Sequence, residues 1–234
     1  MSHPVKGIDH SFALVDDLDA AAAQYQALGF TLSPRGTHSA TKGTANYTIM
    51  FPDDYFELLG ILMPTELNAP RREVLATQGQ GLHAIACRIE TADAAAKALD
   101  GLGIATKSLG SFSRPVDLPD GTEGIASFST VTFTPDETPR GIVFMCEHRS
   151  RDTVWVPELL SHANTACGLS AILAISETPE QEAPRFARLW AAGSVSQQDG
   201  FNIVETGPNS APLILATADR MAAYYKGLDL SGTA

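Results

Sequence analysis

The hydrophobic and polar positions at the start of the chain predict a strand followed by an amphipathic helix. Residues 8–30 open with a mainly apolar segment, and an acidic turn and an alanine-rich segment follow. Ala22, Tyr25 and Leu28 recur at helical spacing, so one face of the helix is expected to be buried. Gly29 stands where a helix commonly ends in a left-handed residue.

The same order of elements returns 74 positions later, at residues 82–104. Asp93 and three alanines align with Asp19 and three alanines, and Gly103 again follows a leucine. Asp17 or Asp19 in the first copy, and Asp93 in the second, are N-cap candidates, because a carboxylate accepts hydrogen bonds from the unpaired N–H groups of a first helical turn. An internal repeat of this length indicates two copies of one supersecondary unit.

Each helix is followed by segments with the composition of strands. In the first copy, residues 45–51 and 55–61 are joined by Pro-Asp-Asp, which favours a turn. In the second copy, residues 125–133 and 141–146 are joined by a segment with two prolines. Each copy is therefore expected to contain one strand, one helix and then two or three strands.

A third, partial copy is expected in the last part of the chain, where residues 168–175 resemble residues 81–87. Its further elements are a helix at 180–192, strands at 201–205 and 213–216, and a short helix at 217–226. The predicted fold class is α+β, built from tandem βαβββ modules. The predicted organisation is a first module at 1–66, a linker at 67–80, a second module at 81–160, and a partial third module or C-terminal extension at 161–234.

Composition and charge restrict the class of partner. The chain has 234 residues, of which 44% are hydrophobic and 18% charged, as in ordinary globular proteins. Its formal net charge is −11. Nucleic acids and anionic membranes attract clustered Lys and Arg, so neither is expected as a partner of this acidic chain.

The cysteines and the hydropathy of the chain predict a cytoplasmic protein. Cys87, Cys146 and Cys167 are odd in number and far apart, and two of them lie in apolar runs. Reduced thiols are therefore expected rather than a disulfide framework or a CxxC metal site. No signal peptide is recognised, and no apolar run approaches the roughly 18 residues of a membrane-spanning helix.

Two residues of the first copy are candidates for chemistry. His10 lies on the first strand, where a histidine is either a hydrogen-bonded core residue or a metal ligand. Glu57 lies in the middle of a strand, flanked by two aromatic residues and two leucines. A buried carboxylate needs a partner, so a metal ligand or a catalytic base is expected there, unless the strand lies at an edge and Glu57 faces water.

The ordered set of motifs resembles the glyoxalase / bleomycin-resistance / extradiol-dioxygenase superfamily, also called vicinal oxygen chelate proteins, over about residues 7–175. The motifs are His10-x4-Val-x-Asp-Leu, Arg35-Gly-Thr-His38, Gly43-Thr-Ala-Asn46, Phe51-Pro-Asp-Asp-Tyr-Phe-Glu57, His148 with Trp155, and His162-Ala-Asn164. Within that superfamily the set is most similar to the glyoxalase-like domain proteins. The resemblance implies a U-shaped mixed sheet around a pocket, with the helices outside it.

In metal-dependent members each module contributes a ligand from its first strand and one from its last, typically His and Glu. The resemblance therefore implies His10 and Glu57 as ligands of a divalent metal such as Zn, Ni, Mn or Fe. The second module departs from this pattern, because Ala84 rather than His83 aligns with His10. A shift of one residue turns a side chain to the other face of a sheet, so His83 is expected outside the pocket unless a β-bulge restores it.

The last strand of the second module leaves two alternatives, because only one of the neighbours Glu147 and His148 can face the pocket. Analogy to Glu57 favours Glu147, and the resemblance favours His148. With His148, the pocket resembles a site of two histidines and one carboxylate. A pocket that binds no metal is the other hypothesis.

Three further polar residues are candidates for contact with a substrate. Arg114 could hold a carboxylate or an enolate with its forked guanidinium, in a catalytic or a binding role, or could be an ordinary surface residue. His38 and Asn46 flank a glycine-containing loop and could line the mouth of the pocket.

The leading functional hypothesis is a metal-assisted lyase, isomerase or dioxygenase that acts on a small oxygenated molecule, with Glu57 moving a proton. The alternative is a protein of the same fold that binds a drug or metabolite without catalysis, in a cavity lined by aromatic residues. A homodimer formed through the third unit is compatible with both.

Overall fold

A computed structural model describes residues 2–118, 121–227 and 230. The first module contains β1 (Ile8–Val15), α1 (Leu18–Ala27), β2 (Gly36–Thr37), β3 (Thr44–Met50) and β4 (Tyr55–Ile61). Its strands lie in the order β2-β3-β4-β1. The predicted βαβββ unit is confirmed, with β2 as a short addition that its two residues did not reveal.

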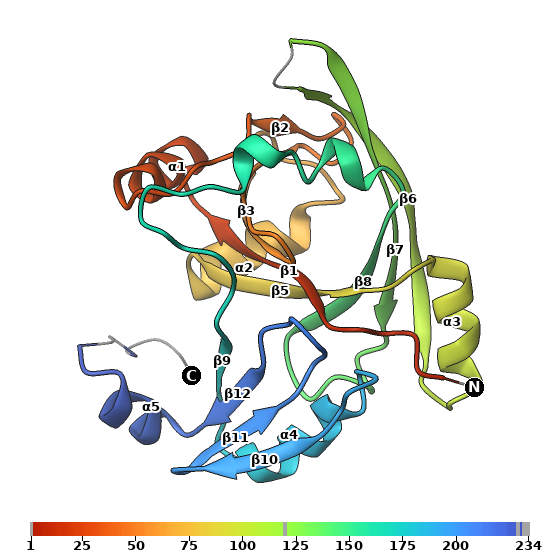
Figure 1. The fold of residues 1–234 in the computed structure, drawn as a ribbon, viewed down its shortest axis with the longest axis vertical. Coiled ribbons are helices and arrows are strands. Elements are labelled where there is room, and N and C mark those ends of the chain that lie inside the picture. Colours follow the sequence, from red (N-terminus) through yellow and green to blue (C-terminus); the bar gives the residue numbers. More distant parts are fainter. Residues whose placement is uncertain (1, 119–120, 228–229, 231–234) are drawn as a thin grey trace.

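The second module repeats this arrangement. It contains β5 (Gly81–Arg88), α3 (Ala92–Asp100), β6 (Thr106–Asp117), β7 (Glu123–Phe133) and β8 (Ile142–His148). Antiparallel pairing of β1 with β5 joins both modules into one sheet, ordered β2-β3-β4-β1-β5-β8-β7-β6. Figure 1 shows this mixed sheet curled, with α1 and α3 at opposite ends outside it. The predicted α+β class and U-shaped sheet are confirmed.

The expected linker at 67–80 contains a helix, α2 (Ala69–Gln78). The helix has no fully buried residue, which explains why the hydropathy pattern did not predict it. Asn68 fixes its start, because the Asn68 side chain bonds the backbone of Lys42, Met63 and Thr65. Val74 and Leu75 pack on the same core cluster as Phe12, so α2 lies against the inner face of β1.

The last part of the chain forms a sheet of its own, visible at the bottom of Figure 1. Its elements are β9 (Ile172–Ile175), α4 (Pro179–Ala187), β10 (Val195–Gln198), β11 (Phe201–Val204), β12 (Leu213–Ala216) and α5 (Ala218–Tyr224). The order β10-β11-β12-β9 matches that of the first module, so this unit has a full βαβββ set rather than the partial one expected. Strand β10 is exposed along its whole length and has no apolar pattern to predict it.

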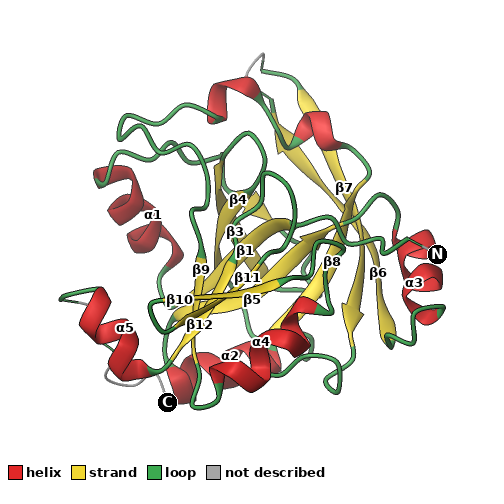
Figure 2. Cartoon of the chain, turned by 60° about the horizontal axis from the view of Figure 1, so that its bottom comes forward, coloured by secondary structure: helices red, strands yellow, loops and turns green. Residues whose placement is uncertain are grey.

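The third unit packs against the outer face of the second module. The largest apolar core joins Phe186 and Trp190, which lie in and just after α4, to Cys87 of β5 and Met145 of β8. Figure 2 shows the strands of both sheets enclosed by peripheral helices. This packing buries the outer face of the second module.

A segment with two short 3₁₀ helices, Arg151–Thr153 and Pro157–Leu159, returns from β8 to the first module across the open side of the curled sheet (Figure 1). Trp155 Nε1 donates to Phe51 O at 2.9 Å. His162 uses both ring nitrogens, at 3.0 Å from Thr31 N and 2.9 Å from Met50 O. His162 therefore holds this segment against the first module.

Within the described part of the chain, no helix is long and apolar enough to cross a membrane.

Candidate active site and metal centre

The register of the sheet brings His10 and Glu57 onto its inner face. On parallel strands β1 and β4, His10 pairs with Tyr55 and Phe12 pairs with Glu57. Because side chains alternate along a strand, His10, Phe12, Tyr55 and Glu57 share one side. The His10 ring stacks on Tyr55 with 4.3 Å between centroids, and both side chains are buried.

A β-bulge adds Asp9 to this face. Ile8 pairs with Cys87 and His10 with Ala86, so Asp9 is an extra residue on β1. Asp9 is 1% exposed, and its Oδ1 accepts from His10 Nδ1 at 2.7 Å. The sequence analysis did not single out Asp9; its one signal was an aspartate inside an otherwise apolar strand.

His148 completes the group from β8. Its Nε2 lies 2.9 Å from Asp9 Oδ1, so one carboxylate oxygen joins two imidazoles. The His148 ring packs edge-on against Phe128 and Trp155. Among the described residues, His148 Nδ1 is buried and has no hydrogen-bond partner.

Glu147 faces the opposite side of β8. Its Oε2 accepts from the backbone N–H of Ala92 at 2.8 Å, at the first turn of α3. A carboxylate there satisfies an unpaired N–H and the positive end of the helix dipole. The structure therefore brings His148, and not Glu147, to the cluster that contains His10.

The two histidines keep Asp9 ionised. Burial alone would raise the pKa of the Asp9 carboxyl, but the nearby His148 and His10 outweigh it and hold that pKa well below its usual range. An ionised carboxylate only accepts hydrogen bonds, so His10 Nδ1 and His148 Nε2 are both donors to Asp9. In neutral rings this leaves lone pairs on His10 Nε2 and His148 Nδ1.

Glu57 lies beside the other nitrogen of His10. Glu57 Oε2 is 3.9 Å from His10 Nε2, and Glu57 Oε1 accepts from Asn46 Nδ2 at 2.9 Å. Both Glu57 and Asn46 are buried. The four side chains Glu57, His10, Asp9 and His148 therefore form a continuous row across the inner face.

Basic side chains surround Glu57. Lys42, Arg71 and Arg114 each interact electrostatically with its carboxylate. Burial and then Arg71 lower the pKa of Lys42 to about 8, while Glu57 opposes that shift. The predicted candidate Arg114 thus lies by Glu57, whereas Lys42 and Arg71 escaped the sequence analysis because they come from a loop and from the unpredicted helix α2.

His38 lies next to these cations. Burial, followed by Lys42 and Arg114, lowers its pKa to about 3, so the ring is neutral near pH 7. His38 Nδ1 is 2.7 Å from Thr44 Oγ1, and its ring meets Phe112 edge-on. His38 therefore lies at the basic edge of the face, and a role in substrate binding stays a prediction.

The β-bulge that would restore His83 is present. Phe12 pairs with Ala84 and Ala13 with Leu82, so His83 is the extra residue on β5. Its ring contacts Phe12 of the inner face, and burial followed by Arg71 lowers its pKa to about 4. The expectation that His83 lies outside the pocket is therefore corrected, although His83 does not join the group around Asp9.

The buried donors fit a divalent metal. Asp9, His10 and His148 each offer a ligand atom, and these atoms lie within 4.8 Å of one another. Two imidazoles and a carboxylate are a donor set suited to Fe, Mn, Ni or Zn. The unpartnered Nδ1 of His148 also agrees with a ligand not bonded to the protein. Asp9 enters this candidate set, whereas the predicted ligand Glu57 faces the second ring nitrogen of His10.

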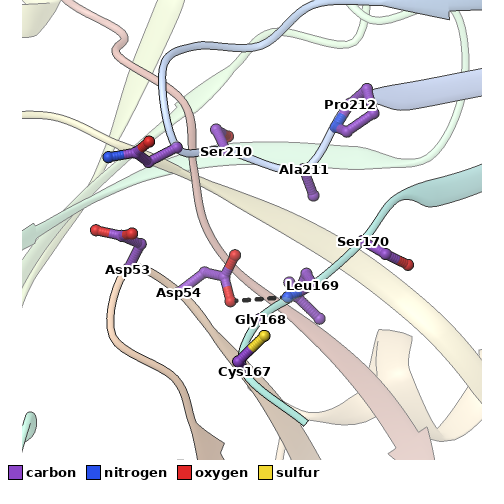
Figure 3. Close-up of a pocket in the computed structure, with 10 residues that line it drawn as sticks. Asp53, Asp54, Cys167, Gly168, Leu169, Ser170, Ser210, Ala211 and Pro212 are labelled. Atoms are coloured by element: carbon purple, nitrogen blue, oxygen red, sulfur yellow. Dashed lines mark hydrogen bonds between the residues drawn. The ribbon is translucent and has the colours of Figure 1, made fainter.

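Two cavities open among the described residues. One of about 220 Å³ is lined by Arg114, Thr48, Thr37, Val154 and others, at the open side of the curled sheet. The other, of about 300 Å³, lies between the β3–β4 turn and the third unit (Figure 3). Asp53 and Asp54 border the second cavity, and no basic residue is among those that line it. Only the first shares a residue, Arg114, with the surroundings of Glu57.

Comparison with known sequences decides the family. The sequence model of the glyoxalase-like domain family matches residues 8–190. The chain belongs to that family. The match spans both modules of the large sheet and α4, so it includes every residue of the inner-face row. No curated protein sequence matches this glyoxalase-like protein significantly.

Three solved structures are similar to this chain to different extents. A hypothetical protein from Staphylococcus aureus superposes with a TM-score of 0.66 at 14% identity, covering 90% of this chain and 86% of that one. Methylmalonyl-CoA epimerase from Mycobacterium tuberculosis gives 0.48 at 17% identity, covering 63% and 91%. A variant of methylmalonyl-CoA epimerase from Streptomyces coelicolor, in complex with 2-nitronate-propionyl-CoA, gives 0.46 at 20% identity, covering 62% and 99%. The first of these extends the shared fold over the third unit, since it covers nine tenths of the glyoxalase-like protein.

Proposed function

We propose that this glyoxalase-like protein is a metal-assisted lyase, isomerase or dioxygenase that acts on a small oxygenated molecule. The observation that carries the proposal is the buried row Glu57–His10–Asp9–His148 on the inner face, with Asp9 Oδ1 within 2.9 Å of both imidazoles. Burying two histidines and two carboxylates in contact is costly, and structural needs of the sheet do not call for it. Such groups cluster where a fold carries out chemistry.

His10 and His148, with Asp9 or Glu57 as the carboxylate, would hold the ion. When bound, a divalent ion supplies a Lewis acid that draws electron density from a substrate oxygen. Asp9 Oδ1 lies within 2.9 Å of one nitrogen of each imidazole, so the groups that would hold the ion already lie close together. Zn, Ni, Mn and Fe all suit this donor set.

Glu57 is proposed as the group that moves the proton. The Asn46 amide holds Oε1 and leaves Oε2 facing His10 and the interior of the curled sheet. A carboxylate held in this orientation is placed to accept a proton from a carbon next to a carbonyl. Tyr55 and Trp155 cover the histidines from the side of the returning segment and exclude water there.

Metal content tests the proposal. The full chain, purified without chelator, is expected to carry about one equivalent of Zn, Ni, Mn or Fe by elemental analysis, and chelation should lower its melting temperature. His148→Gln should lose the metal. Glu147→Gln is the matched control, because the Glu147 side chain faces α3 rather than the inner face. A wild-type protein without stoichiometric metal, and without a gain in melting temperature from any of the four ions, contradicts the proposal.

Chemistry can be tested with a panel of 2-oxo and 2-hydroxy acids in deuterated water. Proton NMR should show deuterium entering beside a carbonyl group with the wild type and not with Glu57→Gln. A panel that exchanges equally with both proteins argues against Glu57 as the base. This test is independent of the metal measurement, because Glu57→Gln is assayed on protein whose metal content has been determined.

A non-catalytic binding protein is the second candidate. The observation that favours it is the aromatic lining of the second module, where Phe112 and Phe128 stack with centroids 5.1 Å apart. Binding would then rest on burial and stacking. Ligands found by thermal shift should in that case bind His10→Ala and Glu57→Ala about as well as the wild type. A cytoplasmic setting and a homodimer stay predictions under either function.

A further inference from the structure

The charge around Glu57 is opposite to that of the molecule. The chain carries a net charge of −11, yet Lys42, Arg71 and Arg114 gather around one carboxylate. They come from three separate elements: the loop before β3, helix α2 and strand β6. All three are partly buried. A local excess of positive charge at a partly buried position needs a compensating anion.

We propose that Lys42, Arg71 and Arg114 bind an anionic group of the substrate, a carboxylate or a phosphate, and hold it beside Glu57. This inference rests on the proposed function of the same face. It adds the substrate class, a small oxygenated anion, and it assigns binding roles to Lys42 and Arg71.

The protein leaves these cations without close carboxylate partners. Among the described residues, none of the three forms an ion pair within 4.0 Å, whereas Arg35, Arg140 and Arg188 all do. Lys42 Nζ lies 3.1 Å from the centre of the Phe112 ring, a contact that holds the ammonium without neutralising it. In the described part of the chain, Arg71 Nε is buried and has no hydrogen-bond partner.

Gly36 gives Arg114 and Asn46 their positions. A Cβ at residue 36 would lie 2.7 Å from Arg114 Cζ and 2.3 Å from Asn46 Oδ1. Only glycine leaves room for the guanidinium to reach over β2 toward Asn46. Arg114 also lines the cavity of about 220 Å³ at the open side of the sheet, so a ligand entering there meets it directly.

The chemistry of the three groups selects the ligand. A guanidinium binds carboxylate and phosphate oxygens through paired hydrogen bonds, and an ammonium adds a point charge. His38 is neutral near pH 7 because its pKa is lowered to about 3, so it does not repel these cations. Among the described residues, Glu57 is the one carboxylate that interacts with all three cations, so an anion with one or two negative charges balances the group and a neutral analogue does not.

Calorimetry with matched probes tests the inference on the full chain after chelation, so that metal coordination by the probe does not contribute. The probes are malonate, its neutral dimethyl ester and inorganic phosphate. Binding of malonate, phosphate or both, without binding of the ester, supports the inference and identifies which anion is preferred. Affinity should also fall as NaCl rises.

Arg71→Met and Arg114→Met should each weaken binding of the preferred anion about 10- to 100-fold, as expected for the loss of a charge-assisted hydrogen bond. Lys97→Met, an exposed residue on α3, is the control with the same change of charge and should leave the affinity unchanged. Equal affinity for malonate and its ester, no binding of either anion, or unchanged affinity in both arginine variants overturns the inference. If a variant does not fold, the comparison of ester with anion and the salt dependence still decide.

Failure here can be told apart from failure of the proposed function. Anion binding is measured on metal-free protein, and metal content is measured without any anion. If the protein binds metal but does not bind malonate or phosphate, the proposed function stands and the proposed anion site is wrong.

Discussion

The two modules of the large sheet have the same strand order but contribute differently to the site. Positions 74 apart correspond, so Ala84 of β5 takes the place of His10. On the paired strands, Phe12 lies beside Glu57 in the first module, and Ala86 lies beside Phe144 in the second. Apolar Ala84 and Phe144 therefore occupy the positions that correspond to His10 and Glu57. The backbone is symmetric and the chemistry is not.

The bulges of the two modules are also symmetric. Asp9 on β1 and His83 on β5 are each the extra residue at corresponding positions, and both turn toward the inner face. Asp9 meets His10 and His148, while His83 meets Phe12. A bulge thus creates one more inward position in each module, and the residue placed there decides whether the position serves a cluster of polar groups or the apolar core.

Variants of Asp9 and His83 test this difference between the bulges. Asp9→Asn removes the charge that holds both imidazoles, so affinity for the bound metal should fall about 10- to 100-fold. His83→Asn, at the corresponding bulge, should leave the affinity unchanged. Competition with a chelator of known affinity measures both. Equal losses in the two variants would show that the bulges do not differ in this way.

The apolar half of the inner face should matter for stability where the polar half matters for chemistry. Phe144 packs against His10 and Phe12, so Phe144→Ala should lower the free energy of unfolding by about 3 kcal/mol. Glu57→Gln keeps shape and the contact with Asn46, so it should cost about 1 kcal/mol or less. Urea denaturation of the metal-free proteins compares them. A larger loss for Glu57→Gln would contradict this division of roles.

Two buried aspartates of the first module differ in their partners. Asp9 accepts hydrogen bonds from two histidines. Asp54 accepts one from Leu169 N, but burial still raises the pKa of Asp54 to about 6. A raised pKa in the folded state means that protonation of Asp54 stabilises the protein. This contribution is complete below about pH 4 and is lost as the pH rises through about 6.

Asp54→Asn removes that dependence and keeps an acceptor for Leu169 N. The variant should match the wild type near pH 4 and exceed its stability at pH 7 by roughly 2 kcal/mol, because one pKa unit corresponds to about 1.4 kcal/mol. Urea denaturation at a series of pH values measures the difference. A constant difference between pH 4 and 7 would contradict the assignment, and Asp53→Asn at the neighbouring position is the control.

The sequence predicted those elements of the fold that have a periodic pattern of apolar residues. The repeat predicted both βαβββ modules, and the resemblance to the glyoxalase superfamily implied that His10 and Glu57 lie in one pocket. Helix α2 and strand β10 lack a buried apolar face, so no pattern indicated them.

The site was harder to predict than the fold, because a bulge overrides the alternation of side chains. Asp9 reaches the inner face only through the bulge, and the pairing of β1 with β5 that defines the bulge is a contact between distant segments. The choice between Glu147 and His148 depended in the same way on which face of β8 lies over α3.

The smallest effect concerns how the two repeated helices begin. Asp17 caps α1 within its own segment, with Oδ1 accepting from Ala20 N at 2.9 Å. Thr91 at the start of α3 makes no such bond, and Glu147 of β8 supplies the acceptor instead. Asp17→Ala and Glu147→Ala should therefore each lower the free energy of unfolding by about 1 kcal/mol.

The loss in Asp17→Ala is local to α1, while the loss in Glu147→Ala also weakens the contact between α3 and β8. Hydrogen exchange should then show faster exchange in α1 alone for Asp17→Ala, and in both α3 and the end of β8 for Glu147→Ala. If Glu147→Ala lowers the free energy of unfolding by about 1 kcal/mol but speeds exchange only in α3, then Glu147 caps α3 without holding that helix against β8.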